Sequence, residues 1–142
     1  MVRVTIILII SVAGLFNNAR AQDCNALEGN WKNEFGSILV IDQISTTGQL
    51  IGEYKSSSGV DGKVFPLLGW INNYNTDTGG VVSIAFSVKW KGYSSITSWT
   101  GTCSTDEKGP KIKTLWHLVR PDQQFEWERI IANSSTFRPL SR

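Results

Sequence analysis

This 142-residue sequence has six tryptophans, and the four in its second half each lie close to hydroxyl or amide side chains. An indole ring buries a large apolar surface and has one N–H group that needs a partner. A cluster of such residues therefore suits a cavity that holds a flat, partly polar small molecule. An ordinary aromatic core is the alternative, because buried aromatic side chains usually fill space. The four residues are Trp90, Trp99, Trp116 and Trp127.

Groups that support catalysis are scarce. His117 is the single histidine, so a multi-histidine metal site is excluded. Alternation with Trp116 and Leu118 places His117 on the outer face of its strand, which excludes a Ser-His-Asp triad as well. Glu126 and Glu128 resemble the carboxylate pair of a glycosidase, but their polar surroundings favour a solvated role. The composition thus favours binding over catalysis, with no metal.

Residues 1–21 have the features of a secretory signal peptide. Arg3 precedes an apolar run, and Ala19-Arg20-Ala21 is a small-x-small cleavage pattern. Its removal leaves residues 22–142, which we expect to form one domain of a secreted, extracellular protein. Arg3 and Arg20 account for the whole excess of 14 basic over 12 acidic residues. The remaining chain is neutral, which argues against nucleic acid or a membrane surface as a partner.

Two cysteines, Cys24 and Cys103, are present. Because an exported chain meets oxidising conditions, we expect one disulfide between them; two free thiols are the alternative. Asn133-Ser134-Ser135 is a glycosylation sequon, which makes Asn133 a candidate for a glycan.

Alternating apolar and polar residues predict an all-β fold. Turn signals rich in glycine separate the segments, and no helical period lies between them. Eight such strands can close into an antiparallel up-and-down barrel whose mouth holds one ligand. The predicted strands are residues 30–33, 37–43, 49–55, 63–71, 81–90, 95–103, 112–118 and 130–139.

Two of these strands combine tryptophan with hydroxyl groups on the same face. A face that served only the core would be more uniformly aliphatic, so the mixture favours a lined cavity. One face consists of Ser95, Thr97, Trp99, Gly101 and Cys103, and the other of Ile112, Thr114, Trp116 and Leu118.

Five motifs in order resemble those of avidin and streptavidin, the biotin-binding proteins, over residues 24–138. The first runs from Gly29 to Ser37 and contains Gly-x-Trp; the others are Tyr54, Trp90, the run Ser95-x-Thr97-x-Trp99-Thr100-Gly101-x-Cys103, and Lys113-Thr114-Leu115-Trp116. The resemblance implies a non-catalytic protein that binds biotin and needs no cofactor. Trp31 would then lie at the barrel floor.

For the polar head of biotin, the resemblance implies donors to the ureido oxygen from Asn33, Ser37 and Tyr54. Convergent donors stabilise a negative oxygen here as they do in an oxyanion hole. Ser56 and Ser135 would accept the two ureido N–H groups.

For the rest of the ligand, the resemblance implies that Thr97 meets the ring sulfur and that Trp90, Trp99 and Trp116 enclose the bicyclic body. The valerate carboxylate would meet Ser95 and the backbone N–H groups of the Ser57-Ser58-Gly59 loop. Trp127 matches the tryptophan that a subunit lends to its neighbour. The resemblance therefore also implies a homotetramer of paired dimers.

The chain departs from the family pattern at several positions. Ser135 replaces the Asn or Asp that is the deepest ureido acceptor, and Asn133 would take that role if the register shifted. Tyr93 replaces a small hydroxyl residue near the carboxylate. Ala132 and Ser134 replace larger aliphatic residues at a subunit contact.

The sequence therefore predicts high-affinity sequestration of biotin. A lipocalin-like carrier of a more apolar ligand is the first alternative, since it shares the barrel and Gly-x-Trp but needs no ureido donors. A lectin or glycosidase that uses tryptophan platforms is the second.

Overall fold

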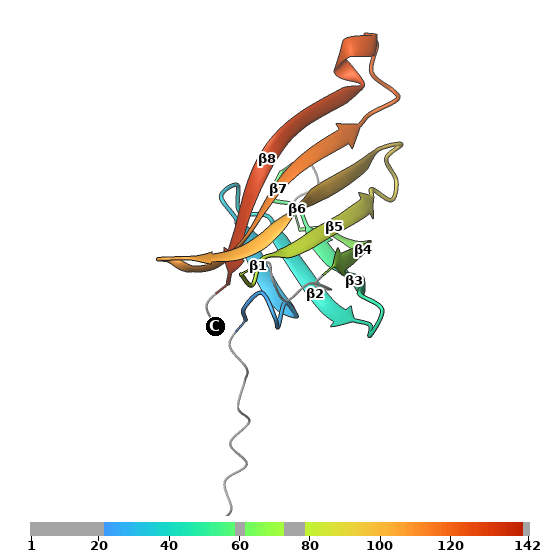
Figure 1. Ribbon diagram of the computed structural model, residues 1–142. Coiled ribbons are helices and arrows are strands. Elements are labelled where there is room, and N and C mark those ends of the chain that lie inside the picture. The colour runs from blue at the N-terminus through green and yellow to red at the C-terminus, as the bar shows by residue number, and fades with distance from the viewer. Residues whose placement is uncertain (1–21, 59–61, 73–78, 141–142) are drawn as a thin grey trace, which may run out of the picture.

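The computed structural model describes residues 22–58, 62–72 and 79–140 and closes eight antiparallel strands into one barrel (Figure 1). The strands pair in chain order, and β8 closes onto β1, which confirms the predicted fold class. The elements are β1 (Gly29–Asn33), β2 (Ile38–Ile44), β3 (Gln49–Lys55), β4 (Val64–Asn72), β5 (Val82–Lys89), β6 (Ile96–Asp106), β7 (Gly109–Val119), the 3₁₀ helix η2 (Glu126–Glu128) and β8 (Ile130–Pro139).

The strands alternate between the barrel interior and its outer surface. In β5, Val82, Ile84, Phe86 and Val88 are buried, while Lys89 at the end of the strand is exposed. Successive side chains of a strand point to opposite faces, so one apolar residue in two is enough to fill the interior.

The β6–β7 hairpin is longer than predicted. The expected strands 95–103 and 112–118 leave residues 104–111 unpaired between them. In the structure, pairing continues through this region to Asp106 opposite Gly109. Gly109 has a φ of 98°, which permits the tight turn. The Asp106 carboxylate accepts hydrogen bonds from Arg138 at 3.1 and 2.7 Å and so ties the hairpin to β8. Other strand limits differ from the prediction by at most one residue.

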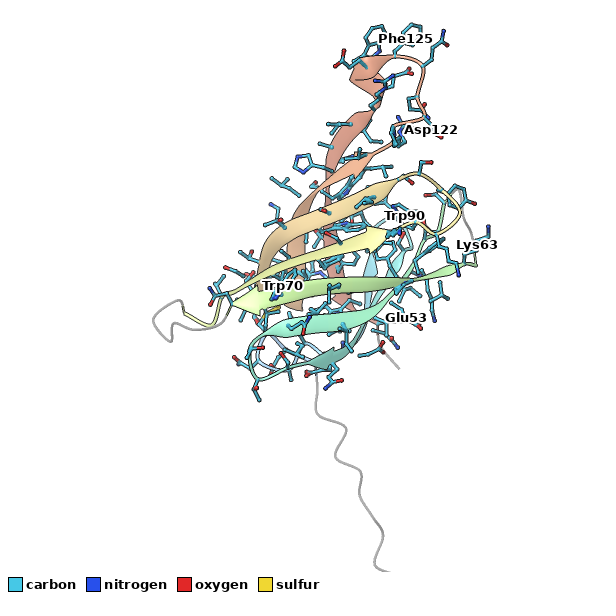
Figure 2. The ribbon with its side chains drawn as sticks, turned by 90° about the vertical axis from the view of Figure 1, so that its right-hand side faces the viewer. Glu53, Lys63, Trp70, Trp90, Asp122 and Phe125 are labelled. Carbon is cyan, nitrogen blue, oxygen red and sulfur yellow. A yellow bond between two sulfur atoms is a disulfide. The ribbon has the colours of Figure 1, made fainter. Side chains whose placement is uncertain are left out.

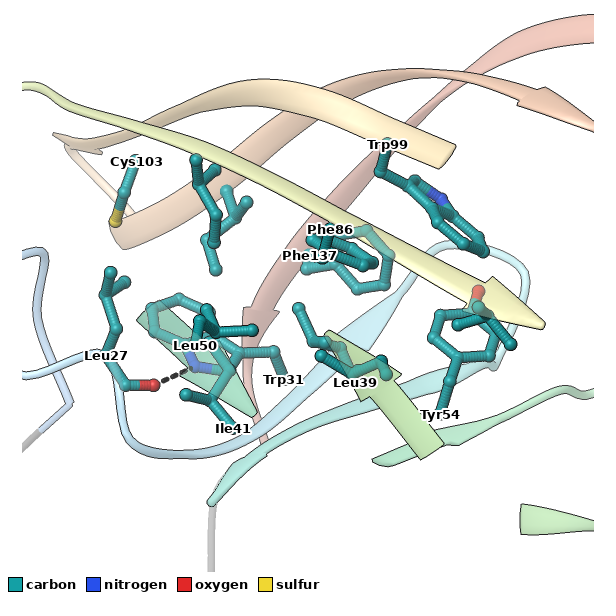
Figure 3. Packing of buried hydrophobic residues seen from close by; sticks show 14 of the residues in the cluster. Leu27, Trp31, Leu39, Ile41, Leu50, Tyr54, Phe86, Trp99, Cys103 and Phe137 are labelled. Carbon is teal, nitrogen blue, oxygen red and sulfur yellow. Dashed lines mark hydrogen bonds between the residues drawn. The ribbon is translucent and has the colours of Figure 1, made fainter. Parts of the chain in front are cut away.

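One end of the barrel is filled by a core around Trp31. This side chain is fully buried, and its indole Nε1 donates to the Leu27 carbonyl at 2.8 Å (Figure 3). The assignment of Trp31 to the barrel floor is therefore confirmed. The predicted disulfide joins Cys24 to Cys103, and both cysteines belong to the buried core.

The other end of the barrel is extended by the hairpin that joins β7 and β8. Figure 2 shows Asp122 and Phe125 on this hairpin, well beyond the other strands. Helix η2 lies within it and was not predicted, because three residues are too few to show a helical period. In the described part of the chain, no helix is both long enough and apolar enough to cross a membrane.

Candidate functional site

A cavity of about 720 Å³ lies at the end of the barrel opposite Trp31. This volume is typical of small-molecule sites. Of the twelve side chains expected to bind ligand, all except Trp127 line it. The described lining residues are Asn33, Phe35, Ser37, Tyr54, Ser56, Ser57, Ser58, Trp90, Tyr93, Ser95, Thr97, Trp99, Trp116, Leu118, Arg120, Asn133 and Ser135.

The turn between β1 and β2 orients the Asn33 amide. Its Oδ1 accepts the backbone N–H groups of Phe35 at 3.1 Å and Ser37 at 2.8 Å. Gly36, with a φ of 88°, lets the chain turn back sharply enough for both bonds. Because the oxygen is engaged with the turn, the Nδ2 amide is the group of buried Asn33 that is free to donate a hydrogen bond.

The Ser37 hydroxyl lies against Ser57 on the loop after β3. The two Oγ atoms are 3.2 Å apart, and Ser37 Oγ also accepts the Ser57 N–H at 3.2 Å. Ser57 Oγ donates its own proton to the Phe35 carbonyl at 2.6 Å. Ser37 must therefore be the donor in the pair, and its proton is the one that a ligand oxygen can capture.

Tyr54 on β3 supplies a buried phenol beside Ser37. Burial raises the pKa of the Tyr54 phenol above its ordinary value; the Ser37 hydroxyl opposes this rise and the charge of Glu34 adds to it. The phenol is therefore protonated at neutral pH and can donate a hydrogen bond. The Tyr54 ring packs against Trp99 with centroids 4.9 Å apart, which fixes its position in the wall.

Two tryptophans hold hydroxyl groups in place. Trp90 Nε1 donates to Thr97 Oγ1 at 2.8 Å, and Trp116 Nε1 donates to Ser135 Oγ at 3.1 Å. Both oxygens therefore accept from an indole and keep one O–H and one lone pair each. Trp99 differs, because its buried Nε1 has no partner within the described chain.

Ser56 begins the loop that follows β3. Its Oγ donates to the Ser58 carbonyl at 2.9 Å and accepts the Ser58 N–H at 3.3 Å. With its proton engaged, the Ser56 hydroxyl is available chiefly as an acceptor. Gly59, the last residue of the expected carboxylate loop, lies outside the described residues.

The β7–β8 register separates Ser135 from Asn133. Ser135 pairs with Thr114 and is 2% exposed, whereas Asn133 pairs with Trp116 and is exposed at the cavity wall. Asn133 Oδ1 accepts the Ser134 N–H at 2.7 Å. Ser135 is thus the deeper of the two candidate acceptors.

Trp127 on η2 does not line the cavity of its own chain. Its side chain is 75% exposed and stacks on Phe125 with centroids 4.6 Å apart. An indole this exposed contributes little to the core of its own barrel.

Two lining residues were missed by the sequence reasoning: Phe35 and Arg120. Leu118 lines the cavity, as its place on the face of Trp116 predicted, and Arg120 lies two residues further along the same face, so extending that face would have found it. Phe35 lies in the turn between Asn33 and Ser37, where no strand periodicity applies.

The candidate catalytic groups do not meet at the cavity. His117 is exposed, as its alternation with Trp116 predicted, and Glu126 and Glu128 belong to η2. No group of histidine, cysteine, aspartate and glutamate side chains in the described ranges could hold a metal ion. The lining groups can therefore donate, accept and enclose, which is the chemistry of a binding site.

Comparisons with known proteins agree on one family. The model of the Avidin family matches residues 21–140. The chain is 32% identical to avidin of Gallus gallus over 117 residues, which is 80% of this chain and 75% of that protein. It is 28% identical to avidin-related protein 4/5 of Gallus gallus over 141 residues, 95% of this chain and 91% of the relative. The crystal structure of Xenavidin superposes with a TM-score of 0.71 at 33% identity, covering 84% of this chain and all of that one.

Proposed function

Because this chain belongs to the avidin family, whose members bind biotin as a ligand and need no cofactor, we propose that it binds biotin in its open-ended cavity without catalysing a reaction. The observation that carries the proposal is the set of oriented donors at Asn33, Ser37 and Tyr54. These three groups line a cavity that is also lined by the indoles of Trp90, Trp99 and Trp116.

The three donors suit the ureido oxygen of biotin. The Asn33 amide, the Ser37 hydroxyl and the protonated Tyr54 phenol each have a proton to give. Resonance in a cyclic urea places negative charge on its oxygen, and preorganised donors in a dry site stabilise that charge strongly. A purely apolar ligand would leave the buried Asn33 amide donor unpaired, which is costly.

The ureido N–H groups need acceptors, for which we assign Ser56 and Ser135. Ser56 has its proton engaged with Ser58, and Ser135 Oγ keeps one lone pair beside the Trp116 indole. Trp90, Trp99 and Trp116 would cover the bicyclic body. Thr97, which accepts from Trp90, keeps its proton for the ring sulfur. At the mouth, Ser95 and the Ser58 backbone would meet the carboxylate.

We further propose a homotetramer in which Trp127 closes the cavity of a neighbouring subunit. The indole is exposed and lies on the hairpin that projects past the mouth (Figure 1). The outer face of the barrel also carries an apolar row: Ile96, Val119 and Ile130 are exposed and stand in cross-strand register on β6, β7 and β8. A contiguous exposed apolar surface of this kind favours association between subunits.

The biological role that fits these features is sequestration of biotin outside the cell. It rests on export through residues 1–21, which lie outside the described residues. Amino-terminal sequencing of the secreted protein would test this: a first residue near Gln22 supports export, and an intact Met1 contradicts it.

Calorimetric titration tests the binding proposal. We expect one biotin per subunit and greatly reduced binding of diaminobiotin, the analogue that lacks the ureido carbonyl. A lipocalin-like carrier would not distinguish the two ligands, and a sugar-binding protein would bind neither. The family assignment does not favour either alternative.

A further inference from the structure

The charge of the cavity comes from one side chain. Among the described lining residues, Arg120 alone has a formal charge, and the others are neutral. Both ion pairs in the described chain involve Asp106, which belongs to the β6–β7 hairpin, so no carboxylate in those residues neutralises Arg120. The cavity therefore has a positive character.

Arg120 lies at the mouth, next to Ser95. It is the third inward residue in the series Trp116, Leu118 and Arg120, and follows the last residue of β7. The pairing of Ile96 with Val119 is the last of the β6–β7 ladder, and Ser95 and Arg120 are the next residue of each strand beyond it. Both line the cavity. Cross-strand neighbours on one face lie about 5 Å apart, close enough for one ligand group to contact both.

The hairpin holds the guanidinium in place and leaves part of it unpaired. The backbone N–H of Arg120 donates to the Arg129 carbonyl at 2.7 Å. In the side chain, Arg120 Nη2 donates to the Glu128 carbonyl at 2.9 Å. Arg120 Nε is buried and has no hydrogen-bond partner in the described chain. A second cation lies close to the cavity, because Lys63 Nζ donates a hydrogen bond at 3.3 Å to the hydroxyl of the lining residue Tyr93. A buried, unpaired donor on a charged group favours an anionic partner.

We propose that Arg120 is a specificity-determining residue that selects ligands ending in a carboxylate. The protein would then prefer free biotin to biotin whose carboxyl group has become an amide, as in biotin attached to a lysine side chain. This inference rests on the proposed function, because biotin must first occupy the cavity with its ureido ring inward and its acid at the mouth. A charge-assisted hydrogen bond to the guanidinium would make the difference about 10- to 100-fold in affinity.

The test compares dissociation constants for biotin and biotinamide, measured by competition, in four proteins. Arg120→Gln removes the charge, and Arg120→Met is a second neutral variant that keeps the aliphatic stem. Arg129→Gln is the matched control, since it removes an equal charge from the same hairpin at a residue that does not line the cavity. Circular dichroism checks that each variant is folded.

We expect the unsubstituted protein and Arg129→Gln to bind biotin more tightly than biotinamide. In the two Arg120 variants, the ratio of the two dissociation constants should fall about tenfold, because biotin binds more weakly while biotinamide binding is unchanged. An unchanged preference in either folded Arg120 variant overturns the inference, as does an equal loss for both ligands, which would mean a structural role. If the unsubstituted protein binds neither ligand, the proposed function itself fails and takes this inference with it.

Discussion

At the residue scale, the donors and acceptors that are not used within the protein define what the cavity can bind. Asn33 Oδ1 accepts hydrogen bonds from the β1–β2 turn, and Ser56 Oγ donates its proton to the Ser58 carbonyl. Thr97 and Ser135 accept from indoles. These internal bonds orient each polar group before a ligand arrives, which reduces the entropy lost on binding.

The donor role of Asn33 can be separated from its role in the turn. Asn33→Asp keeps an oxygen for the Phe35 and Ser37 N–H groups but removes the amide donor and adds a negative charge. We expect the protein to remain folded while its affinity for biotin falls by at least about 1 to 3 kcal/mol, because a buried ligand oxygen loses a donor. Asn33→Ala should lose affinity too, with some destabilisation of the turn. A titration curve for Asn33→Asp that matches the unsubstituted protein would reject the assignment.

Tyr54 gives the site a pH dependence. Burial raises the pKa of its phenol above the ordinary value of 10.0, so the folded protein keeps this proton to higher pH than the unfolded chain does. The contribution of Tyr54 to stability is therefore complete below about pH 10 and is lost as the pH rises through the folded-state pKa.

We expect biotin affinity to be insensitive to Tyr54 ionisation between pH 7 and about pH 10 and to fall above that range, because a phenolate has no proton to donate. Titrations at stepped pH, with tyrosinate absorbance recorded in parallel, measure both events. Tyr54→Phe is the control and should bind more weakly without the alkaline step. An identical alkaline step in that variant would assign the loss to another group.

At the element scale, β6, β7 and β8 each contribute two residues to the cavity wall, and the β7–β8 hairpin supplies the exposed indole. The β6–β7 and β7–β8 ladders bring Trp99, Trp116 and Asn133 level with one another across three strands. Helix η2 then carries Trp127 beyond the barrel, where Phe125 is its only aromatic partner among the described residues of its own chain.

Trp127→Lys tests whether this hairpin completes a neighbour's site. The residue is 75% exposed, so we expect the folding of the single barrel to be unaffected. We expect biotin to dissociate faster and native mass spectrometry to show a weakened tetramer, because the ligand loses an indole cover. Glu126→Lys, which adds a positive charge to the same helix and keeps the indole, should leave dissociation unchanged. A dissociation rate for Trp127→Lys equal to that of the parent contradicts the shared site.

At the scale of the whole molecule, the barrel is packed with apolar side chains at one end and hollow at the other. Trp31 and Cys103 lie in the packed core (Figure 3), and Tyr54 and Trp99 belong to the same core but also border the cavity. Trp31 and the two cysteines do not line the cavity, so a change at the packed end can leave the binding site intact.

Loss of the Cys24–Cys103 disulfide tests this division. The bond spans 79 residues of sequence, so removing it should lower the free energy of unfolding by about 2 to 4 kcal/mol. Denaturant titration of the Cys24→Ala/Cys103→Ala variant measures the loss. Biotin stoichiometry should be retained, because neither cysteine lines the cavity. An unchanged unfolding midpoint would contradict the stabilising role, and lost stoichiometry in the folded variant would contradict the division.

The strands, their inward faces and the disulfide could be predicted from the sequence because these features depend on local alternation and on cysteine content. Val82 to Lys89 alternates with period two, and that pattern alone decides which residues face inward. The resemblance in the motifs, from Asn33 to Trp116, likewise identified side chains that line the cavity.

Depth along the barrel was decided only by the tertiary structure. Ser135 and Asn133 share one face of β8, and the β7–β8 register alone places Ser135 under Trp116 and Asn133 nearer the mouth. The same register brings Arg120 to the rim of the cavity, and the length of the β7–β8 hairpin carries Trp127 outside its own barrel. Alternation repeats along a strand and does not tell how far a residue lies from the cavity mouth. Closure of eight strands into a barrel fixes that distance for every inward residue.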